Sequence, residues 1–420
     1  MDLLEFSDLR YGLFVHYGLY SQLARGEWVM NREKITPLQL REIALRFQPS
    51  AFAADEICRL ALAGGMKYLV FTTMHHEGFR LYRSALSDFN SWQYCERDLV
   101  RELVESARAH GLKLGLYHSL NNWYDQPDAV AALEDPAAYQ IFIEQTFARL
   151  QELLRLFTPI DIFWYDGWWP FSAEGWQAER MNQQLRQEQP NLLFNGRNGL
   201  PGDFRTPEGH LTAPDPWHPW EACMTLNQHW GYHAHDNDWK SPREVIKMLL
   251  TCSLGKGNLL LNIGPRGDGS IPAESIEIIS QVGSWLRNGG EELLQGVQVM
   301  PFSPGLRQSG ENGDWDAAGP LYAKGQRLYW LLFYCPGSQA VLTGLEMKVR
   351  EVRCGRFGRL DFVQSEDRVS INLPPGLEKE LAPVLVFECD RAPSIYRTGG
   401  MRVPKVPHPR YDPVQPDIKY

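Results

Sequence analysis

Cysteine is sparse in this sequence, and none of it lies in a pairing motif. The seven cysteines are an odd number, and no CxxC pair occurs among them. This argues against a disulfide framework and for a reducing compartment. Cys58 and Cys252 lie within apolar helical patterns, where a free thiol behaves as a small hydrophobic side chain.

Long apolar runs and an excess of basic residues are also missing. No apolar run reaches the roughly 18 residues that a membrane-spanning helix needs. The net charge of −9 argues against a nucleic acid or an anionic membrane as partner. The first residues, Met1 to Glu5, contain neither the basic nor the apolar part of a secretion signal. We therefore expect a cytoplasmic protein, although a chain with its signal removed would have the same start.

Aromatic residues are abundant, at 12% of the 420 residues. This excess fits carbohydrate binding, and it equally fits a large core. Hydrophobic residues make up 44% of the chain and charged residues 22%, so a folded protein with a sizeable core is expected. The length suits an α/β barrel of roughly 250–300 residues followed by a smaller module.

Short apolar runs alternate with amphipathic segments over residues 1–295, which predicts a parallel sheet in a (β/α)8-like barrel. Six strands are clear, so either two further strands are weak or the barrel is irregular. The expected strands are Leu13–Tyr17, Tyr68–Thr73, Leu114–His118, Ile160–Asp166, Leu192–Asn195 and Asn258–Ile263.

The helical segments carry end signals. Asp98–His110 has apolar residues at helical spacing and stops at Gly111, and residues 136–157 form a long amphipathic pattern. Ser241 followed by Pro242 predicts the start of a helix that runs through Leu254.

The pattern changes after residue 295. Short strand-like runs separated by turn residues predict a small antiparallel β-sandwich over residues 296–392. Residues 393–420 contain six prolines and predict an extended tail, which is a candidate arm for a neighbouring subunit in a homo-oligomer.

Polar side chains gather at the ends of the predicted strands. His16 follows the first strand, His75 and His76 the second, His118 the third and Asp166 the fourth. The carboxyl ends of barrel strands share one face, where barrel enzymes place their chemistry. Asp166 is followed by Gly167 and two tryptophans, which offer flat apolar faces for sugar rings. Neutral imidazoles bind sugar hydroxyls without requiring a charged substrate.

A metal site is the first interpretation of these histidines. Because His75 and His76 are adjacent, their side chains on a strand would point to opposite sides and would not chelate one ion. His233 and His235 have a metal-ligand spacing but lie in a distant loop. We expect neither a metal nor a cofactor.

Glycoside hydrolysis by two carboxylates is the second interpretation. Asp166 suits the ionised carboxylate, since His and Arg donors around it would keep it charged. The second carboxylate should come from a later loop. Two candidates are Glu208, in the segment DFRTPE, and Glu221, in the segment WEAC.

These residues lie in longer motifs that resemble the α-L-fucosidases of glycoside hydrolase family 29 over residues 10 to 295. The motifs are His16 in LFVHYG, Glu27-Trp28, HHEGF at His75–Phe79, Tyr117-His118-Ser119, Trp164-Tyr165-Asp166, Trp230-Gly231-Tyr232 and GNLLLNIGP at Gly257–Pro265.

The resemblance implies a retaining hydrolase that removes terminal α-L-fucose from fucosylated glycans without a cofactor. Asp166 matches the nucleophile, and Glu208 is favoured over Glu221 as the acid/base. His118 stands where some members carry Tyr. The positions that match fucose contacts, or adjoin one in a shared motif, are His16, Glu27, Trp28, His75, His76, His118, Trp164 and Arg197.

Three alternatives stay open. A glycosidase with α-L-galactosidase side activity would differ by one hydroxyl in its substrate. A non-catalytic barrel would bind fucose without turnover, and a metal hydrolase would lose activity with a chelator. We assign Asn258–Pro265 to folding.

Overall fold

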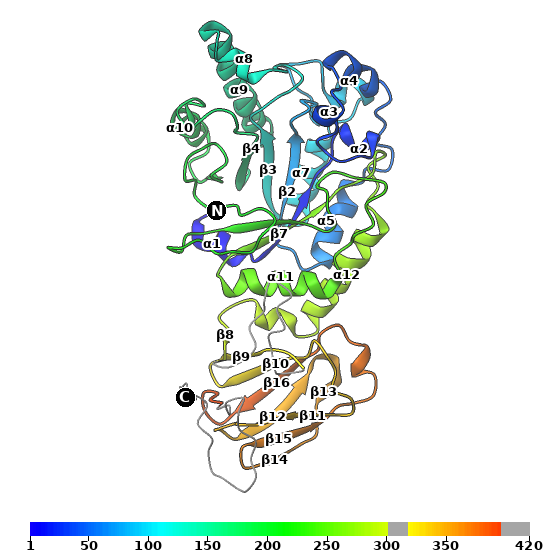
Figure 1. Cartoon of the computed structure of the whole chain (residues 1–420), viewed down its shortest axis with the longest axis vertical. Helices are drawn as coiled ribbons and strands as arrows, with labels where there is room; N and C mark the ends of the chain where they lie inside the picture. Colours follow the sequence, from blue (N-terminus) through cyan, green and yellow to red (C-terminus); the bar gives the residue numbers. More distant parts are fainter. Residues whose placement is uncertain (301–317, 396–420) are drawn as a thin grey trace, which may run out of the picture. The chain divides into compact units, whose positions relative to one another are not determined.

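The computed structural model describes residues 1–300 and 318–395 of the chain (Figure 1). It divides into two compact units, Met1–Val282 and Gly283–Tyr420. The predicted tail at 393–420, with its expected role in a homo-oligomer, lies almost wholly outside the described residues.

The first unit contains a curled, seven-stranded parallel sheet in the order β5-β4-β3-β2-β1-β7-β6, an irregular barrel of the expected α/β type (Figure 1). Its strands are β1 (Tyr11–Val15), β2 (Tyr68–Met74), β3 (Lys113–Ser119), β4 (Ile162–Asp166), β5 (Leu193–Phe194), β6 (Glu221–Thr225) and β7 (Asn258–Ile263).

All six expected strands are present. The structure has a seventh strand, β6, which was not among the six expected from the sequence. Its sequence, EACMT, has only a short apolar run without Val, Ile or an aromatic residue, so its strand signal is weak, yet it pairs with β7 along its whole length. Glu221, expected in a loop, is therefore the first residue of a strand.

An irregular segment at residues 203–209 bridges the two edge strands. The Asp203 N–H donates to the Phe194 carbonyl on the β5 side. On the β6 side, the N–H groups of Glu221 and Cys223 donate to the carbonyls of Arg205 and Pro207. Single bridges replace a regular ladder here, and Pro207 has no N–H to donate. This segment takes the place of the eighth strand.

Alternation along the strands separates an inner from an outer face. A buried cluster of inward side chains includes Phe14, Tyr117, Trp164 and Leu260, with Tyr117 opposite Trp164 in the register. Because side chains alternate along a strand, Asp166 shares the inner face with Trp164. The inner face thus leads from an aromatic core to a carboxylate at the strand ends.

Helices cover the outer face. The N-terminal cap predicted at Ser241 is present and forms a capping box with Glu244 at α11. Asp98 caps α7 in the same way. The helices are α1 (Leu3–Asp8), α2 (Tyr20–Leu23), α3 (Val29–Arg32), α4 (Pro37–Ala44), α5 (Ala54–Ala63), α6 (Ser91–Cys95), α7 (Leu99–Ala109), α8 (Ala129–Ala132), α9 (Pro136–Phe157), α10 (Ala178–Glu188), α11 (Pro242–Leu254) and α12 (Ala273–Arg287).

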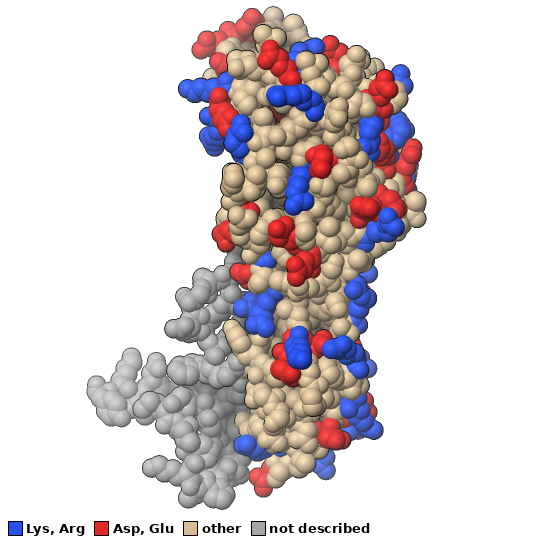
Figure 2. Space-filling view, turned by 90° about the vertical axis from the view of Figure 1, so that its right-hand side faces the viewer, with Lys and Arg blue, Asp and Glu red and all other residues tan. Residues whose placement is uncertain are grey.

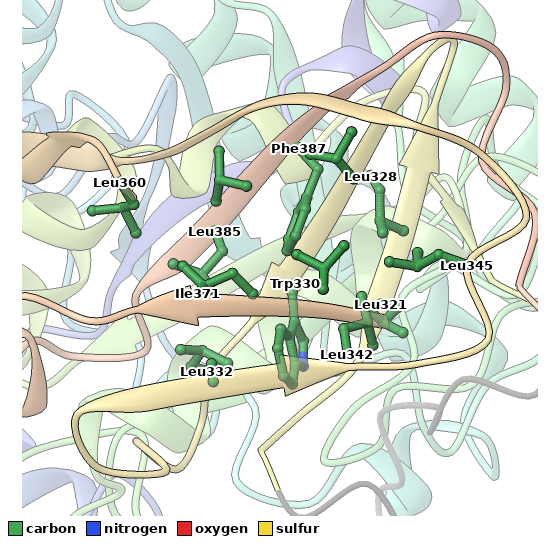
Figure 3. Close-up of a cluster of buried hydrophobic side chains, with 14 of the residues drawn as sticks. Leu321, Leu328, Trp330, Leu332, Leu342, Leu345, Leu360, Ile371, Leu385 and Phe387 are labelled. Carbon is green, nitrogen blue, oxygen red and sulfur yellow. The ribbon is translucent and has the colours of Figure 1, made fainter. Parts of the chain in front are cut away.

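The second unit is an antiparallel sandwich of a six-stranded and a three-stranded sheet, ordered β13-β12-β16-β10-β9-β8 and β11-β15-β14. Side chains of both sheets share one core, with Trp330, Leu342, Ile371 and Phe387 among its members (Figure 3). The strands are β8 (Gln298–Val299), β9 (Leu321–Lys324), β10 (Arg327–Leu331), β11 (Gln339–Leu342), β12 (Val349–Cys354), β13 (Gly358–Arg359), β14 (Phe362–Ser365), β15 (Arg368–Asn372) and β16 (Val384–Cys389).

Short 3-10 turns at Gly290–Leu293, Gly355–Phe357 and Leu377–Lys379 complete this unit. Within the part of the chain that the structure describes, no helix is both long and apolar enough to cross a membrane. On the face drawn in Figure 2, acidic and basic side chains are interspersed rather than gathered by sign.

Candidate active site

A cavity of about 220 Å³ lies at the carboxyl ends of the barrel strands. A space of this size holds one small ligand rather than an oligosaccharide. Nine of the residues singled out in the sequence line it: His16, Glu27, Trp28, His75, His76, Trp164, Asp166, Arg197 and Glu208.

Asp166, the last residue of β4, is a buried carboxylate held by several donors. Its Oδ1 lies 3.1 Å from Nη1 of Arg197, and its Oδ2 accepts a hydrogen bond of 2.8 Å from the Tyr117 hydroxyl. Burial acts to raise the pKa of Asp166, but Arg197, His76 and Tyr117 outweigh it and hold that pKa below its usual value. The carboxylate is therefore ionised at neutral pH, as a nucleophile requires.

Arg197 joins this carboxylate to a second one. Its Nη2 lies 2.6 Å from the Glu208 carboxylate, while Nη1 contacts Asp166. The guanidinium also lies over the ring of Trp164, at 4.7 Å from the centroid. Burial acts against the charge of Arg197, but the neighbouring carboxylates raise its pKa above the usual value. Arg197 thus stays charged and holds both carboxylates at one side of the cavity.

Glu208 reaches the cavity from the irregular segment 203–209. Its side chain is 44% exposed, in contrast to the 13% exposure of Asp166. A carboxyl group that must exchange protons with water in each cycle needs this access.

The buried histidines are neutral hydrogen-bonding groups. Burial is the largest cause that lowers the pKa of His16 to about 3 and of His76 to about 4. Asn262 donates to the Trp230 carbonyl and so presents its Oδ1 to Nδ1 of His16 at 2.6 Å. His16 Nδ1 therefore carries the proton, and its Nε2 is an acceptor. Asn262 belongs to the stretch assigned to folding, yet it sets the tautomer of a cavity residue.

The prediction that His75 and His76 point to opposite sides is wrong. Both residues follow the last residue of β2, Met74, so strand alternation no longer applies to them. Their ring centroids are 4.0 Å apart, and both rings line the cavity. Nδ1 of His76 lies 2.6 Å from the Ser119 hydroxyl, which orients its ring.

As a consequence, His75, His76 and Asp166 each place one possible metal-ligand atom within 4.8 Å of the others. The electrostatics disfavour a cation. Both oxygens of Asp166 already have donors, and the charged guanidinium of Arg197 lies 3.1 Å from one of them. A metal ion would have to displace or approach that positive charge.

Glu27 and Trp28 form another part of the cavity wall. The Gly231 N–H donates to Oε2 of Glu27 at 2.8 Å, and burial raises the pKa of Glu27. Trp28 stacks on Trp169, with ring centroids 5.7 Å apart and an interplanar angle of 12°. Trp169 also lines the cavity, so both stacked rings contribute to its aromatic wall.

His118 does not line the cavity. It lies opposite Tyr165 on the outer face of the sheet and is fully buried there. Its Nδ1 lies 2.9 Å from the Thr73 hydroxyl. Burial, followed by the positive charges of Arg149 and Arg80, lowers the pKa of His118. The adjacent Tyr117 takes the inward position instead, because strand alternation turns successive side chains to opposite faces.

Glu221 does not line the cavity either. It is fully buried inside the barrel, at the start of β6, where its Oε2 accepts from the Tyr68 hydroxyl at 2.5 Å. Its Oε1 accepts from the Trp164 indole at 3.0 Å. Burial raises the pKa of Glu221 to about 7.

Five further cavity residues were not among the predicted site residues, although Tyr117, Trp169 and Trp230 lie in motifs noted in the sequence: Phe14, Tyr117, Trp169, Cys223 and Trp230. The alternation signal could have found Phe14 and Tyr117, since each lies two residues before a polar strand end, His16 and Ser119. Cys223 and Trp230 come from β6 and the following loop, where the strand signal was weak.

Comparison with known proteins agrees with this geometry. A family model described as Alpha-L-fucosidase matches residues 4–291. The tissue alpha-L-fucosidase of Rattus norvegicus is 33% identical over 322 residues, covering 69% of this chain and 69% of that protein. The plasma alpha-L-fucosidase of the same species is 31% identical over 333 residues, covering 69% and 70%. The structure of alpha-L-fucosidase isoenzyme 1 from Paenibacillus thiaminolyticus matches with a TM-score of 0.77 and 30% identity, covering 93% of this chain and 99% of that chain.

Proposed function

We propose, because the chain belongs to the α-L-fucosidase family of glycoside hydrolases, that it removes terminal α-L-fucose with retention, through a fucosyl-Asp166 intermediate. Asp166 is the nucleophile in this proposal, and Glu208 is the acid/base. The observation that carries it is the guanidinium of Arg197, which contacts both carboxylates inside one cavity.

In the first step, a carboxylate oxygen of Asp166 attacks C1 of fucose. The bond from C1 to the leaving oxygen breaks, and the Glu208 carboxyl donates its proton to that oxygen. The lowered pKa of Asp166 supports its role as the ionised partner. The Tyr117 hydroxyl and Arg197 also restrain the attacking group in one orientation.

In the second step, Glu208 accepts a proton from a water molecule, and the water oxygen attacks C1. The bond between C1 and Asp166 breaks, and fucose leaves with its original anomeric configuration. Retention needs carboxyl groups about 5–5.5 Å apart. Asp166 and Glu208 contact the two terminal nitrogens of one guanidinium, which supports their action on one substrate.

The walls of the cavity suit a neutral 6-deoxy sugar. His16 and His76 are uncharged and can bind hydroxyl groups as acceptors or donors. The rings of Phe14 and Trp230 lie beside His16, with Phe14 and Trp230 5.9 Å apart. These rings provide an apolar surface for the methyl group of fucose, which stands where L-galactose has a hydroxymethyl group.

Azide rescue tests the assignment of the two carboxylates. Glu208→Ala should form the intermediate from an aryl fucoside with a good leaving group and then stall, because no base activates water. Added azide should restore turnover and yield α-L-fucosyl azide, because azide attacks the β-linked intermediate from the face opposite Asp166. Asp166→Ala should lose hydrolysis of every fucoside, and any product formed with azide should be β-L-fucosyl azide, because azide then replaces the carboxylate and inverts C1 once.

Glu221→Gln is the matched control for this experiment. It changes the other candidate carboxylate without removing its volume, and it should hydrolyse aryl fucosides without azide. Rescue of Glu221→Gln but not of Glu208→Ala would exchange the two roles. Fucose binding by the wild type without turnover of any fucoside would mean a binding protein instead.

A further inference from the structure

A second, wider groove adjoins the cavity and has no role so far. Its volume is about 640 Å³, against about 220 Å³ for the cavity. Trp169, Arg197 and Glu208 line both spaces and form the boundary between them. A ligand bound across this boundary would therefore pass beside the Glu208 carboxylate.

Trp168 is the most conspicuous side chain of the groove. It is 42% exposed, and within the described residues no aromatic ring packs on its indole. Its backbone is nevertheless held, since the Trp176 indole donates to the Trp168 carbonyl at 2.5 Å. A fixed tryptophan with an open face is a ready stacking surface. The neighbouring Trp169 is different, because its ring is already stacked on Trp28.

Part of the groove is lined by residues with small side chains. Gly196, Gly199 and Pro201 contribute almost only backbone there. Gly199 has a φ of +90°, and a side chain at that position would contact the backbone of Ala173. The buried Asn198 fixes this turn, since its Oδ1 accepts from the Leu200 N–H at 3.2 Å. These residues thus leave space for a ligand in the groove.

Arg205 contributes a free charged donor. It lies on the segment 203–209, three residues before Glu208, and its side chain is exposed. Among the described residues no carboxylate forms an ion pair with it, unlike Arg197 and Arg186 nearby. A guanidinium carries five N–H donors and can bind several hydroxyl groups of one sugar ring.

We propose that this groove binds the leaving saccharide, with a pyranose ring stacked on Trp168 and its hydroxyl groups bound by Arg205. This inference rests on the proposed function. The acid/base must protonate the leaving oxygen, so the leaving group lies on the side of the cavity that Glu208 lines. The groove has almost three times the volume of the cavity. The natural substrates are therefore fucosylated oligosaccharides rather than alkyl or aryl fucosides.

Two substrates that share fucose but differ in the leaving group test this assignment. α-L-Fucosyl fluoride places a single atom beyond C1, whereas a fucosylated trisaccharide fills the groove. Trp168→Ala should lower kcat/KM for the trisaccharide by about tenfold to a hundredfold, the range expected for loss of one aromatic stacking surface. It should leave kcat/KM for the fluoride within about twofold, because the fluoride makes no contact in the groove.

Further variants separate stacking from general damage. Trp168→Phe keeps a flat ring and should recover most of the trisaccharide activity. Arg205→Met should lower kcat/KM for the trisaccharide and leave kcat/KM for the fluoride unchanged. Trp217→Ala is the matched control, since Trp217 is 49% exposed and lines neither space. This variant should leave kcat/KM unchanged for both substrates.

Each other outcome overturns a different claim. Equal losses on both substrates, or no loss on the trisaccharide, would refute the groove assignment while the proposed function stands. A wild-type protein that turns over the trisaccharide no better than methyl α-L-fucoside would also refute it. If the wild type fails to hydrolyse the fluoride at all, the proposed function fails, and the groove assignment fails with it.

Discussion

Glu221 accepts a hydrogen bond from the indole of Trp164 at 3.0 Å, inside the barrel and away from the cavity surface. The same tryptophan also contacts the site, because the guanidinium of Arg197 lies over the Trp164 ring. A carboxyl group that the sequence offers as an acid/base therefore supports the wall on which the site is built.

Glu221→Gln should make the protein more stable at high pH than the wild type. Burial raises the pKa of Glu221 to about 7 in the folded chain, above its value of about 4.3 in an unfolded one. Between these values the folded state holds an extra proton, so wild-type stability falls as the pH rises through this window. Glutamine does not titrate, and its amide can still accept from Trp164.

The difference between the two proteins should approach about 4 kcal/mol above pH 7 and be small below pH 4.5. Melting temperatures of both proteins across pH 4.5 to 8 measure it. Parallel pH profiles would show that Glu221 is already ionised in the folded protein.

Tyr117→Phe should weaken catalysis and shift its pH dependence. The hydroxyl donates to Asp166 at 2.8 Å and helps to lower the pKa of that carboxyl. Its loss should reduce kcat by about tenfold to a hundredfold. The acidic limb of kcat/KM should move to higher pH, because a larger fraction of Asp166 is then protonated. Phenylalanine keeps the ring that stacks on His75, so an unshifted limb would show that the hydroxyl has only a packing role.

His76→Asn and His118→Asn should have opposite consequences. His76 lines the cavity with its Nε2 3.7 Å from Asp166, so its loss should cut kcat/KM by about a hundredfold or more. His118 lies on the outer face with Nδ1 beside Thr73, and the Asn amide can replace that contact. Its variant should lose stability but keep kcat/KM within about threefold. Steady-state kinetics on one fucoside, with melting temperatures as control, decide between the two positions.

The pair of His118 and Tyr117 shows how far the sequence leads. Strand β3 was predicted almost to its ends, and the carboxyl ends of four strands were correctly expected at one site. The sequence does not state which alternate set of side chains faces inward. Because side chains alternate with a period of two, a shift of one position turned His118 outward and brought Tyr117 to Asp166.

The residues that the sequence could not place belong to irregular backbone. Segment 203–209 carries Glu208 and pairs through isolated bridges, so no period marks it. Strand β6 is recognisable only by its pairing with β7. The motif HHEGF singled out His75 and His76, but only the end of β2 at Met74 explains why both rings face the same space.

Removal of metal ions should leave activity unchanged. His75, His76 and Asp166 could approach one cation, but Arg197 and the Tyr117 hydroxyl already occupy the two oxygens of Asp166. Dialysis against a chelator, followed by assay with and without added divalent ions, checks this. Activity that disappears on dialysis and returns with one metal would revive the metal-hydrolase alternative.

Arg197→Lys should lower activity strongly, although the substitution keeps the positive charge. A guanidinium contacts Asp166 through Nη1 and Glu208 through Nη2 at the same time, and its flat face lies over Trp164. An ammonium group is a single point of charge and cannot hold both carboxylates or stack. We expect kcat to fall by about a hundredfold or more, with the acidic limb of kcat/KM moved to higher pH as Asp166 loses its main partner. Arg186→Lys is the control, because Arg186 makes a comparable pair with Asp203 outside the cavity. Equal activity of Arg197→Lys and the control would mean that positive charge alone suffices, and that the shared guanidinium does not position the two carboxylates.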